Sequence, residues 1–177
     1  MIRVLPFAGA ALGGALVLAL CLALLGGGAD GDAQPRAATS TWNAPDGSYS
    51  ISTPQGWKAV ASGPAATVLQ RADKRGVVVI RERAALEQPL DAVAAQLERR
   101  LEKSVPDFRP AGARVAPVGD EDGLVYTFVR PRAGQVQSVV VAPAGDRSYT
   151  LDLVAEGDAP DVARELAGMV RSFSPAR

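Results

Sequence analysis

The side chains of this sequence that could do chemistry are acids and arginines, because it contains no histidine and a single cysteine, Cys21. The lack of histidine excludes imidazole acid–base catalysis, serine–histidine and cysteine–histidine nucleophiles, and every histidine-ligated metal site. A single thiol also excludes an intramolecular disulfide and a cysteine metal cluster. No glycine-rich phosphate loop, SxxK motif or dinucleotide fingerprint occurs. We therefore predict no catalytic, cofactor-binding or metal-binding residue and no bound cofactor.

The densest group of acids is Asp120, Glu121 and Asp122 in the stretch GDEDG. Three carboxylates in a tight loop could bind Ca²⁺, which takes oxygen ligands, but the stretch lacks the alternating ligand spacing of a calcium loop. Acids between glycines are common in hairpin turns, and this is the interpretation we favour. Two of the 19 acids could still converge as the carboxylate pair of a glycoside hydrolase, although no spacing singles out a pair.

Three side chains are candidate contacts for a partner, namely Trp42, Arg81 and Arg83. The two arginines share one face of a predicted strand and could bind a carboxylate or a phosphate, although a solvated face or pairing with neighbouring acids is commoner. Trp42 lies beside a predicted linker and is the better candidate for exposure. We expect Trp57, in contrast, to pack at the end of the core while its indole N–H donates a hydrogen bond to an acceptor. The net charge of +0, from 19 basic and 19 acidic residues, gives no general attraction to nucleic acid.

A charge-free, largely apolar segment runs from Val4 to Ala29, with Arg3 before it and Asp30 after it. Its apolar part reaches the roughly 20 residues that a helix needs to cross a bilayer. The positive flank favours the cytoplasm, so we predict a signal-anchor over residues 1–26 that crosses the cell membrane once, with the C-terminal domain extracytoplasmic. The alternative is a signal peptide that is cleaved near Ala29, which would release a secreted protein.

Cys21 adds a third alternative, the lipid anchor of a bacterial lipoprotein. Such a cysteine normally follows a small residue and ends the apolar run, whereas here Leu20 precedes it and the run continues to Leu25. Packing in a helix as a small apolar residue is therefore favoured over lipidation. The polar, aperiodic stretch that follows predicts a flexible linker over residues 27–40.

The remaining residues, 41–177, carry the patterns of one folded domain. Alternating apolar residues and turn residues predict two hairpins, at 41–57 and 66–83, and later strands at 112–118, 124–130, 135–142 and 148–155. Apolar residues at helical spacing predict helices over 89–104 and 159–173. We therefore predict the α+β class: a mainly antiparallel sheet of about six strands flanked by two helices, an α/β/α sandwich preceded by one N-terminal hydrophobic helix.

The stretch YSISTPQGW, in which an aromatic strand is followed by Pro54, Gly56 and Trp57, resembles an opening motif of the PsbP/Mog-type α/β/α fold. The closing stretch MVRSF is similar to the end of the same families, which include DcrB-like proteins and exported actinobacterial lipoproteins. The resemblance covers nearly all of residues 41–173. It implies an accessory, assembly or partner-binding protein without shared catalytic residues.

These observations favour a membrane-tethered, extracytoplasmic accessory or binding module that is not an enzyme and that binds an unknown envelope protein or ligand. Two alternatives stay open. One is a hydrolase that uses carboxylates alone on an envelope polymer, and the other is a cytoplasmic assembly chaperone of the DcrB-like kind.

Overall fold

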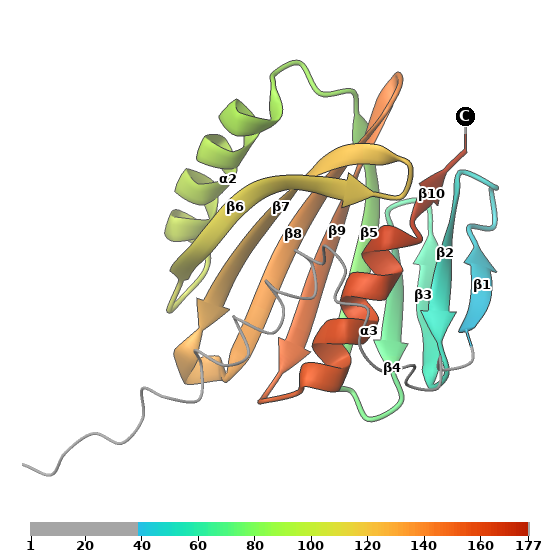
Figure 1. Cartoon of the computed structure of the whole chain (residues 1–177), viewed down its shortest axis with the longest axis horizontal. Coiled ribbons are helices and arrows are strands. Elements are labelled where there is room, and N and C mark those ends of the chain that lie inside the picture. The colour runs from blue at the N-terminus through green and yellow to red at the C-terminus, as the bar shows by residue number, and fades with distance from the viewer. Residues whose placement is uncertain (1–38, 177) are drawn as a thin grey trace, which may run out of the picture.

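The computed structural model describes residues 39–176, in which ten strands and two helices are connected mostly by tight turns (Figure 1). The strands are β1 (Thr39–Asn43), β2 (Tyr49–Pro54), β3 (Trp57–Gly63), β4 (Ala66–Arg71), β5 (Gly76–Ala84), β6 (Arg109–Val118), β7 (Glu121–Arg130), β8 (Gln135–Ala144), β9 (Arg147–Glu156) and β10 (Ser174–Pro175). The helices are α2 (Leu90–Ser104) and α3 (Pro160–Arg171), and a 3-10 turn, η1, covers Pro131–Ala133. The predicted N-terminal helix and most of the predicted linker lie outside the described residues.

The larger sheet has seven strands in the order β3-β4-β5-β9-β8-β7-β6, and every neighbouring pair is antiparallel. Two meanders, β3 to β5 and β6 to β9, meet where Gly76 pairs with Ala155 and Ala84 pairs with Arg147. The connection through α2 carries the chain from the middle of this sheet to its β6 edge. The predicted α+β class with a mainly antiparallel sheet is confirmed.

The predicted single sheet of about six strands is wrong, because the first hairpin belongs to a separate sheet. β1 and β2 pair around the predicted turn, and the two-residue β10 pairs with β2 to complete a three-stranded sheet. After Pro54 the chain turns through Gly56, which has a φ of 88°, and continues as β3 in the larger sheet. No local pattern predicted β3, because its residues after Trp57 are all exposed and show no alternation.

The two helices pack on opposite faces of the larger sheet, as alternate residues of β7 show. Val125 belongs to the main hydrophobic core with α3, whereas Leu124 and Tyr126 belong to a second core with α2. Successive side chains of a strand point to opposite faces, so the two cores lie on the two sides of the sheet. Within residues 39–176 neither helix is long and apolar enough to span a membrane.

Both helices form because an apolar stripe meets the sheet and a proline marks the boundary. α2 begins after Pro89 and buries Leu97 and Leu101. In α3, Pro160 occupies the first turn, where its missing N–H costs nothing, and Asp161 follows it, where a negative charge suits the helix dipole. Burial of each large apolar side chain contributes about 1.5–3 kcal/mol, which suffices to dock both helices.

The strand directions give the molecule two distinct ends (Figure 1). The entry end, at the bottom of the view, contains Thr39 and the turns at 54–57, 71–76 and 130–135. The far end, at the top, contains the turns at 44–48, 63–66, 118–121 and 144–147. The chain therefore enters the domain at the end opposite to these four turns.

Candidate functional site

A cleft of about 920 Å³ opens at the far end of the molecule, and we call it the main cleft. It is lined by four segments, at residues 44–49, 62–67, 80–84 and 146–147. They meet because consecutive antiparallel strands bring every second turn to the same end of a sheet. The cleft is therefore walled by both sheets, since the first segment belongs to the three-stranded sheet.

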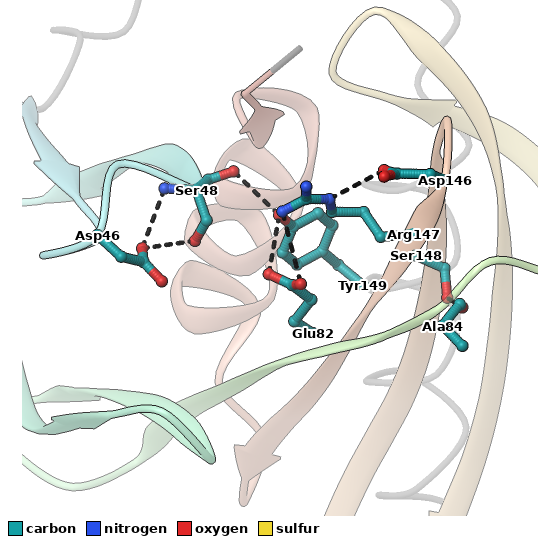
Figure 2. Close-up of polar contacts among 8 residues, drawn as sticks. All are labelled: Asp46, Ser48, Glu82, Ala84, Asp146, Arg147, Ser148 and Tyr149. Carbon is teal, nitrogen blue, oxygen red and sulfur yellow. Dashed lines mark hydrogen bonds and ion pairs between the residues drawn. The ribbon is translucent and has the colours of Figure 1, made fainter.

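Charged side chains of both signs line the main cleft, with Arg147 at their centre (Figure 2). The Nε of Arg147 donates to Asp146 at 3.2 Å, and its Nη1 lies 3.5 Å from a carboxylate oxygen of Glu82. The hydrogen bond to Asp146 is the largest cause that raises the pKa of Arg147 above its ordinary value. Arg147 thus pairs with one acid of its own turn and with one on the neighbouring strand β5, and both acids stay exposed.

Tyr149 is buried, and its hydroxyl contacts two residues that line the cleft. Its hydroxyl donates to the backbone carbonyl of Ser48 at 3.0 Å and lies 3.4 Å from Glu82 (Figure 2). Burial, followed by the negative charge of Glu82, raises the pKa of Tyr149 above its usual 10.0, so the hydroxyl keeps its proton at neutral pH. This hydroxyl ties the β1–β2 turn to the larger sheet.

Asp46 is preorganised in the β1–β2 turn. Its carboxylate accepts hydrogen bonds from the hydroxyl and the backbone N–H of Ser48, at 2.7 and 3.0 Å. These bonds lower the pKa of Asp46 below its ordinary value, so it is charged over the whole neutral range. A glycosidase acid needs the opposite shift, because it must hold a proton to deliver.

Two polar residues at the main cleft have contrasting surroundings. The side chain of Tyr49 is only 7% exposed and borders the cleft, and its hydroxyl is buried against the side chain of Thr67. Burial is the main cause that raises the pKa of Tyr49. Arg83 is exposed on the cleft wall and forms no ion pair with any other described residue. Of these two residues, only Arg83 is accessible to a ligand.

A second cleft of about 570 Å³ adjoins the first, and we call it the side cleft. It shares Asp146 and Arg147 with the main cleft and adds Asp120, Glu121 and residues 174–176. The acidic stretch that we favoured as a hairpin turn does join β6 to β7, with Glu121 and Asp122 already on β7. In the part of the chain that the structure describes, no group of acids is arranged to hold a metal ion.

The sequence-predicted contact residues separate in the structure. Arg81 pairs with Asp152 across β5 and β9, whereas Arg83 lies on the wall of the main cleft. Trp42 is half-buried, packs against the main core and has its ring centre 5.7 Å from that of Tyr49. Cys21 lies outside the described residues. A role in partner contact stays a prediction for Trp42, Arg81 and Arg83.

The core role of Trp57 is confirmed. It is 8% exposed and belongs to the main core. Its indole N–H donates to Glu165 of α3 at 2.8 Å, so the expected hydrogen bond to an acceptor is made.

Sequence reasoning missed most of the cleft residues, among them Asp46, Glu82, Asp146 and Arg147. The predicted strands leave Asp46 in the turn PDG and Asp146 and Arg147 in the turn PAGDR, whereas Glu82 lies on β5. One signal could have grouped these turns: successive hairpin turns of a meander lie alternately at the two ends of the sheet. Only the pairing of β5 with β9 brings Glu82 beside Arg147, and no local pattern encodes that pairing.

Comparison with known proteins identifies the fold. No protein-family model matches the sequence, and no curated protein matches it. The solution structure of cyanobacterial PsbP (CyanoP) from Synechocystis is similar with a TM-score of 0.59 and 15% identity, covering 84% of this chain and 98% of that one. The Ran-binding protein Mog1p of Saccharomyces cerevisiae has a TM-score of 0.59 and 10% identity, over 79% of this chain and 96% of its own.

A third similar structure is PA94 from Pseudomonas aeruginosa, a protein of unknown function, with a TM-score of 0.51 and 15% identity. It matches 78% of this chain and 98% of its own. Identities this low support the architecture and nothing about activity. The expected resemblance is confirmed at the level of structure: the described domain has the PsbP/Mog-type fold.

Proposed function

We propose that this protein is a membrane-tethered, extracytoplasmic accessory module that holds a partner in the main cleft and is not an enzyme. The observation that carries this proposal is a cleft of about 920 Å³ that is walled by both sheets and lined by charged side chains of both signs, among them Arg83, which forms no ion pair with any other described residue.

The chemistry of the cleft supports binding rather than catalysis. General acid–base catalysis on a sugar needs two carboxyl groups whose environments push their pKa values apart. Asp46 is held ionised by Ser48, and Glu82 is engaged by Arg147 and Tyr149. These are contacts that fix the shape of a binding surface.

The position of the cleft supports a tethered module. The charge-free segment before Ala29 is the proposed anchor, and the stretch 27–40 would reach roughly 20 Å as a flexible coil. Thr39 lies at the entry end, whereas the cleft lies at the far end (Figure 1). A domain held by such a tether would present the cleft away from the membrane.

Cell fractionation with intact mass spectrometry of the native protein tests the anchor. We expect the full-length mass in the membrane fraction. A mass that begins near Asp30 in the soluble fraction would contradict tethering, and a mass that begins at Cys21 with acyl chains would replace the helix by a lipid anchor.

Site-specific photocrosslinking in intact cells tests the cleft. A photoreactive amino acid at Ala65, exposed at the main cleft, should give a discrete adduct with an envelope component. The matched control is Ala133, which is also exposed but lies in η1 at the entry end. Equal adducts at both positions, or none at Ala65, would contradict a role for the cleft in binding.

A further inference from the structure

We propose that the exposed edge of β3 receives an added strand, an extended and mostly uncharged segment of a partner protein that pairs with β3 and continues into the main cleft. This inference rests on the proposed function and adds how the partner is held. It follows from the free edge of the larger sheet, from an apolar side chain exposed on it and from the position of the main cleft at its end.

The two sheets of the described chain have four edge strands, and they differ in how well they could receive a further strand. β1 has five residues, and β10 has two, of which one is a proline. β6 is longer but contains two arginines and two prolines, Pro110 and Pro117, which have no N–H to offer. β3 has seven residues, no proline and a single charge, at Lys58. It is therefore the long edge strand with the fewest features that oppose pairing.

The residues of β3 are exposed on both faces of the sheet. All six residues after Trp57 are exposed, although successive side chains of a strand point to opposite faces. β3 pairs with β4 on one side only, so the backbone groups of its other side have no strand beside them among residues 39–176. A row of backbone N–H and C=O groups is matched in regular succession by another extended backbone, which identifies the occupant as a strand.

Val60 marks the place where the added strand gains an apolar contact. Its side chain is 47% exposed, and β4 offers it no paired residue, because the register shifts between Ala59 and Ala61. An apolar side chain of the added strand would cover Val60, as cross-strand pairs do within a sheet. Charge complementarity predicts an acid beside Lys58 and uncharged residues along the rest of the segment.

The main cleft lies at the end of the same edge. Ser62 and Gly63, the last residues of β3, line it together with the β3–β4 turn. Every neighbouring pair in this sheet is antiparallel, and an antiparallel segment on β3 runs from the far end toward the entry end. The first residues of the segment therefore lie in the main cleft, and the following ones cover β3.

The proposed tether argues against a second copy of this chain as the occupant. Two copies of β3 that pair antiparallel are related by a two-fold axis, so their entry ends point in opposite directions. A ten-residue strand such as β8 spans roughly 33 Å, whereas the tether reaches roughly 20 Å. Two copies anchored in one membrane are therefore too constrained to pair through β3, and the segment belongs to another protein.

Binding of a defined peptide to the purified full-length protein in a non-ionic detergent tests the added strand. The probe is a fluorescent eight-residue peptide with blocked ends that alternates threonine and valine and ends in glutamate. Its valines are methylated at the backbone nitrogen, so one edge stays free to pair and fibres do not form. The control peptide has every backbone nitrogen methylated, which removes all donors. We expect the probe to bind about tenfold or more tightly than the control, and the amides of residues 57–63 to exchange hydrogen more slowly when it is bound.

Two matched single variants locate the strand. Val60→Lys places a charge on the edge strand β3, and Val115→Lys does the same on the edge strand β6, where Val115 is 53% exposed. Both valines are about half exposed, so neither change should unfold the domain. We expect Val60→Lys to weaken the probe by about tenfold and Val115→Lys by less than about twofold, because an edge lysine opposes pairing only on its own strand.

Three results would overturn the proposal. Equal binding of the two peptides would do so, and so would equal weakening by the two variants. A dimer of the full-length protein that Val60→Lys dissociates would make the occupant a second copy. If Ala65 crosslinks a partner in cells and Val60→Lys leaves that adduct unchanged, the binding function stands and only the added strand is wrong.

Discussion

The two ends of the domain use the same residue types in opposite ways. At the entry end, Arg71 lies within 3.2 Å of Asp73, 2.8 Å of Asp161 and 3.2 Å of Glu165. Glu165 also accepts the indole N–H of Trp57. At the far end, Arg147 lies 3.2 Å from Asp146, and the nearest oxygen of Glu82 is 3.5 Å away.

Exposure explains why the two clusters have different consequences. The side chain of Arg71 is 20% exposed and that of Glu165 is 21% exposed, whereas Arg147 is 39% and Asp146 is 85% exposed. Solvent screens charges strongly, so exposed ion pairs contribute little to stability and partly buried ones contribute more. The charged side chains at the entry end therefore help to hold α3 to the sheet, whereas those at the far end stay available to a ligand.

The largest expected effect is at Trp57. Trp57→Ala removes a buried ring that packs against Gly76 and leaves Glu165 without its indole donor. We expect the free energy of unfolding to fall by about 3–5 kcal/mol, as for other aromatic deletions from a core. Denaturant unfolding measures this, and a loss below about 1 kcal/mol would show that the entry end is not the structural one.

The next effect concerns the Arg71 cluster. Arg71→Met removes the cation shared by three acids, and we expect a loss of about 2 kcal/mol, between the values for exposed and buried pairs. The photocrosslink at Ala65 should not change, since Arg71 lies at the other end. Unchanged stability would contradict the structural role of this cluster.

The cost of Arg71→Met should depend on pH in a defined direction. Burial raises the pKa of Asp161, but the hydrogen bond and the charge of Arg71 outweigh it, so the pKa lies below the ordinary 3.8. A carboxyl with a lowered pKa stabilises the fold above the unfolded value, and this contribution is lost as the pH falls through the folded value. The wild-type and variant stabilities should therefore converge below about pH 4.

Tyr126, in the second core under α2, gives an effect of the same order at alkaline pH. Burial, followed by the charge of Glu98, raises its pKa from 10.0 to about 12. The folded state therefore keeps a proton that the unfolded state has lost. Stability is complete below pH 10 and is lost progressively toward pH 12, by about 2 kcal/mol in total.

Unfolding of the wild type and of Tyr126→Phe between pH 9 and pH 12 measures this contribution. Tyr49 and Tyr149 also have raised pKa values and titrate in both proteins, so the difference between the two curves isolates Tyr126. Parallel curves would mean that the hydroxyl of Tyr126 is not held protonated by the fold.

The sequence predicted the elements with a local apolar pattern and missed those without one. The stripe that includes Val162 and Leu166 predicted α3, because helical spacing of buried side chains is visible within a dozen residues. β3 and β10 stayed hidden, since the first is exposed after Trp57 and the second has only two residues. The separate sheet was missed because β10 pairs with β2 from more than a hundred residues away.

The candidate site was harder to predict than the fold for the same reason. Asp46 and Asp146 sit in turns that the sequence marks clearly, but turns far apart in the chain converge only through the sheet order. Trp57 shows the converse, since a core role could be expected from the nature of its side chain alone. Local chemistry was therefore predictable, and the meeting of distant turns was not.

The smallest expected effect on the free energy of unfolding gives the most direct test of the contrast between the entry end and the far end. Glu121→Gln with Asp146→Asn should change the free energy of unfolding by less than about 0.5 kcal/mol, because both acids are exposed and Asp146 pairs only with its neighbour Arg147 among the described residues. The same variant should weaken the photocrosslink at Ala65, so binding and stability would separate at the far end, whereas at Arg71 stability changes without binding. A loss above about 1 kcal/mol from this double variant would mean that the far-end acids hold the fold together, and the contrast between the two ends would fail.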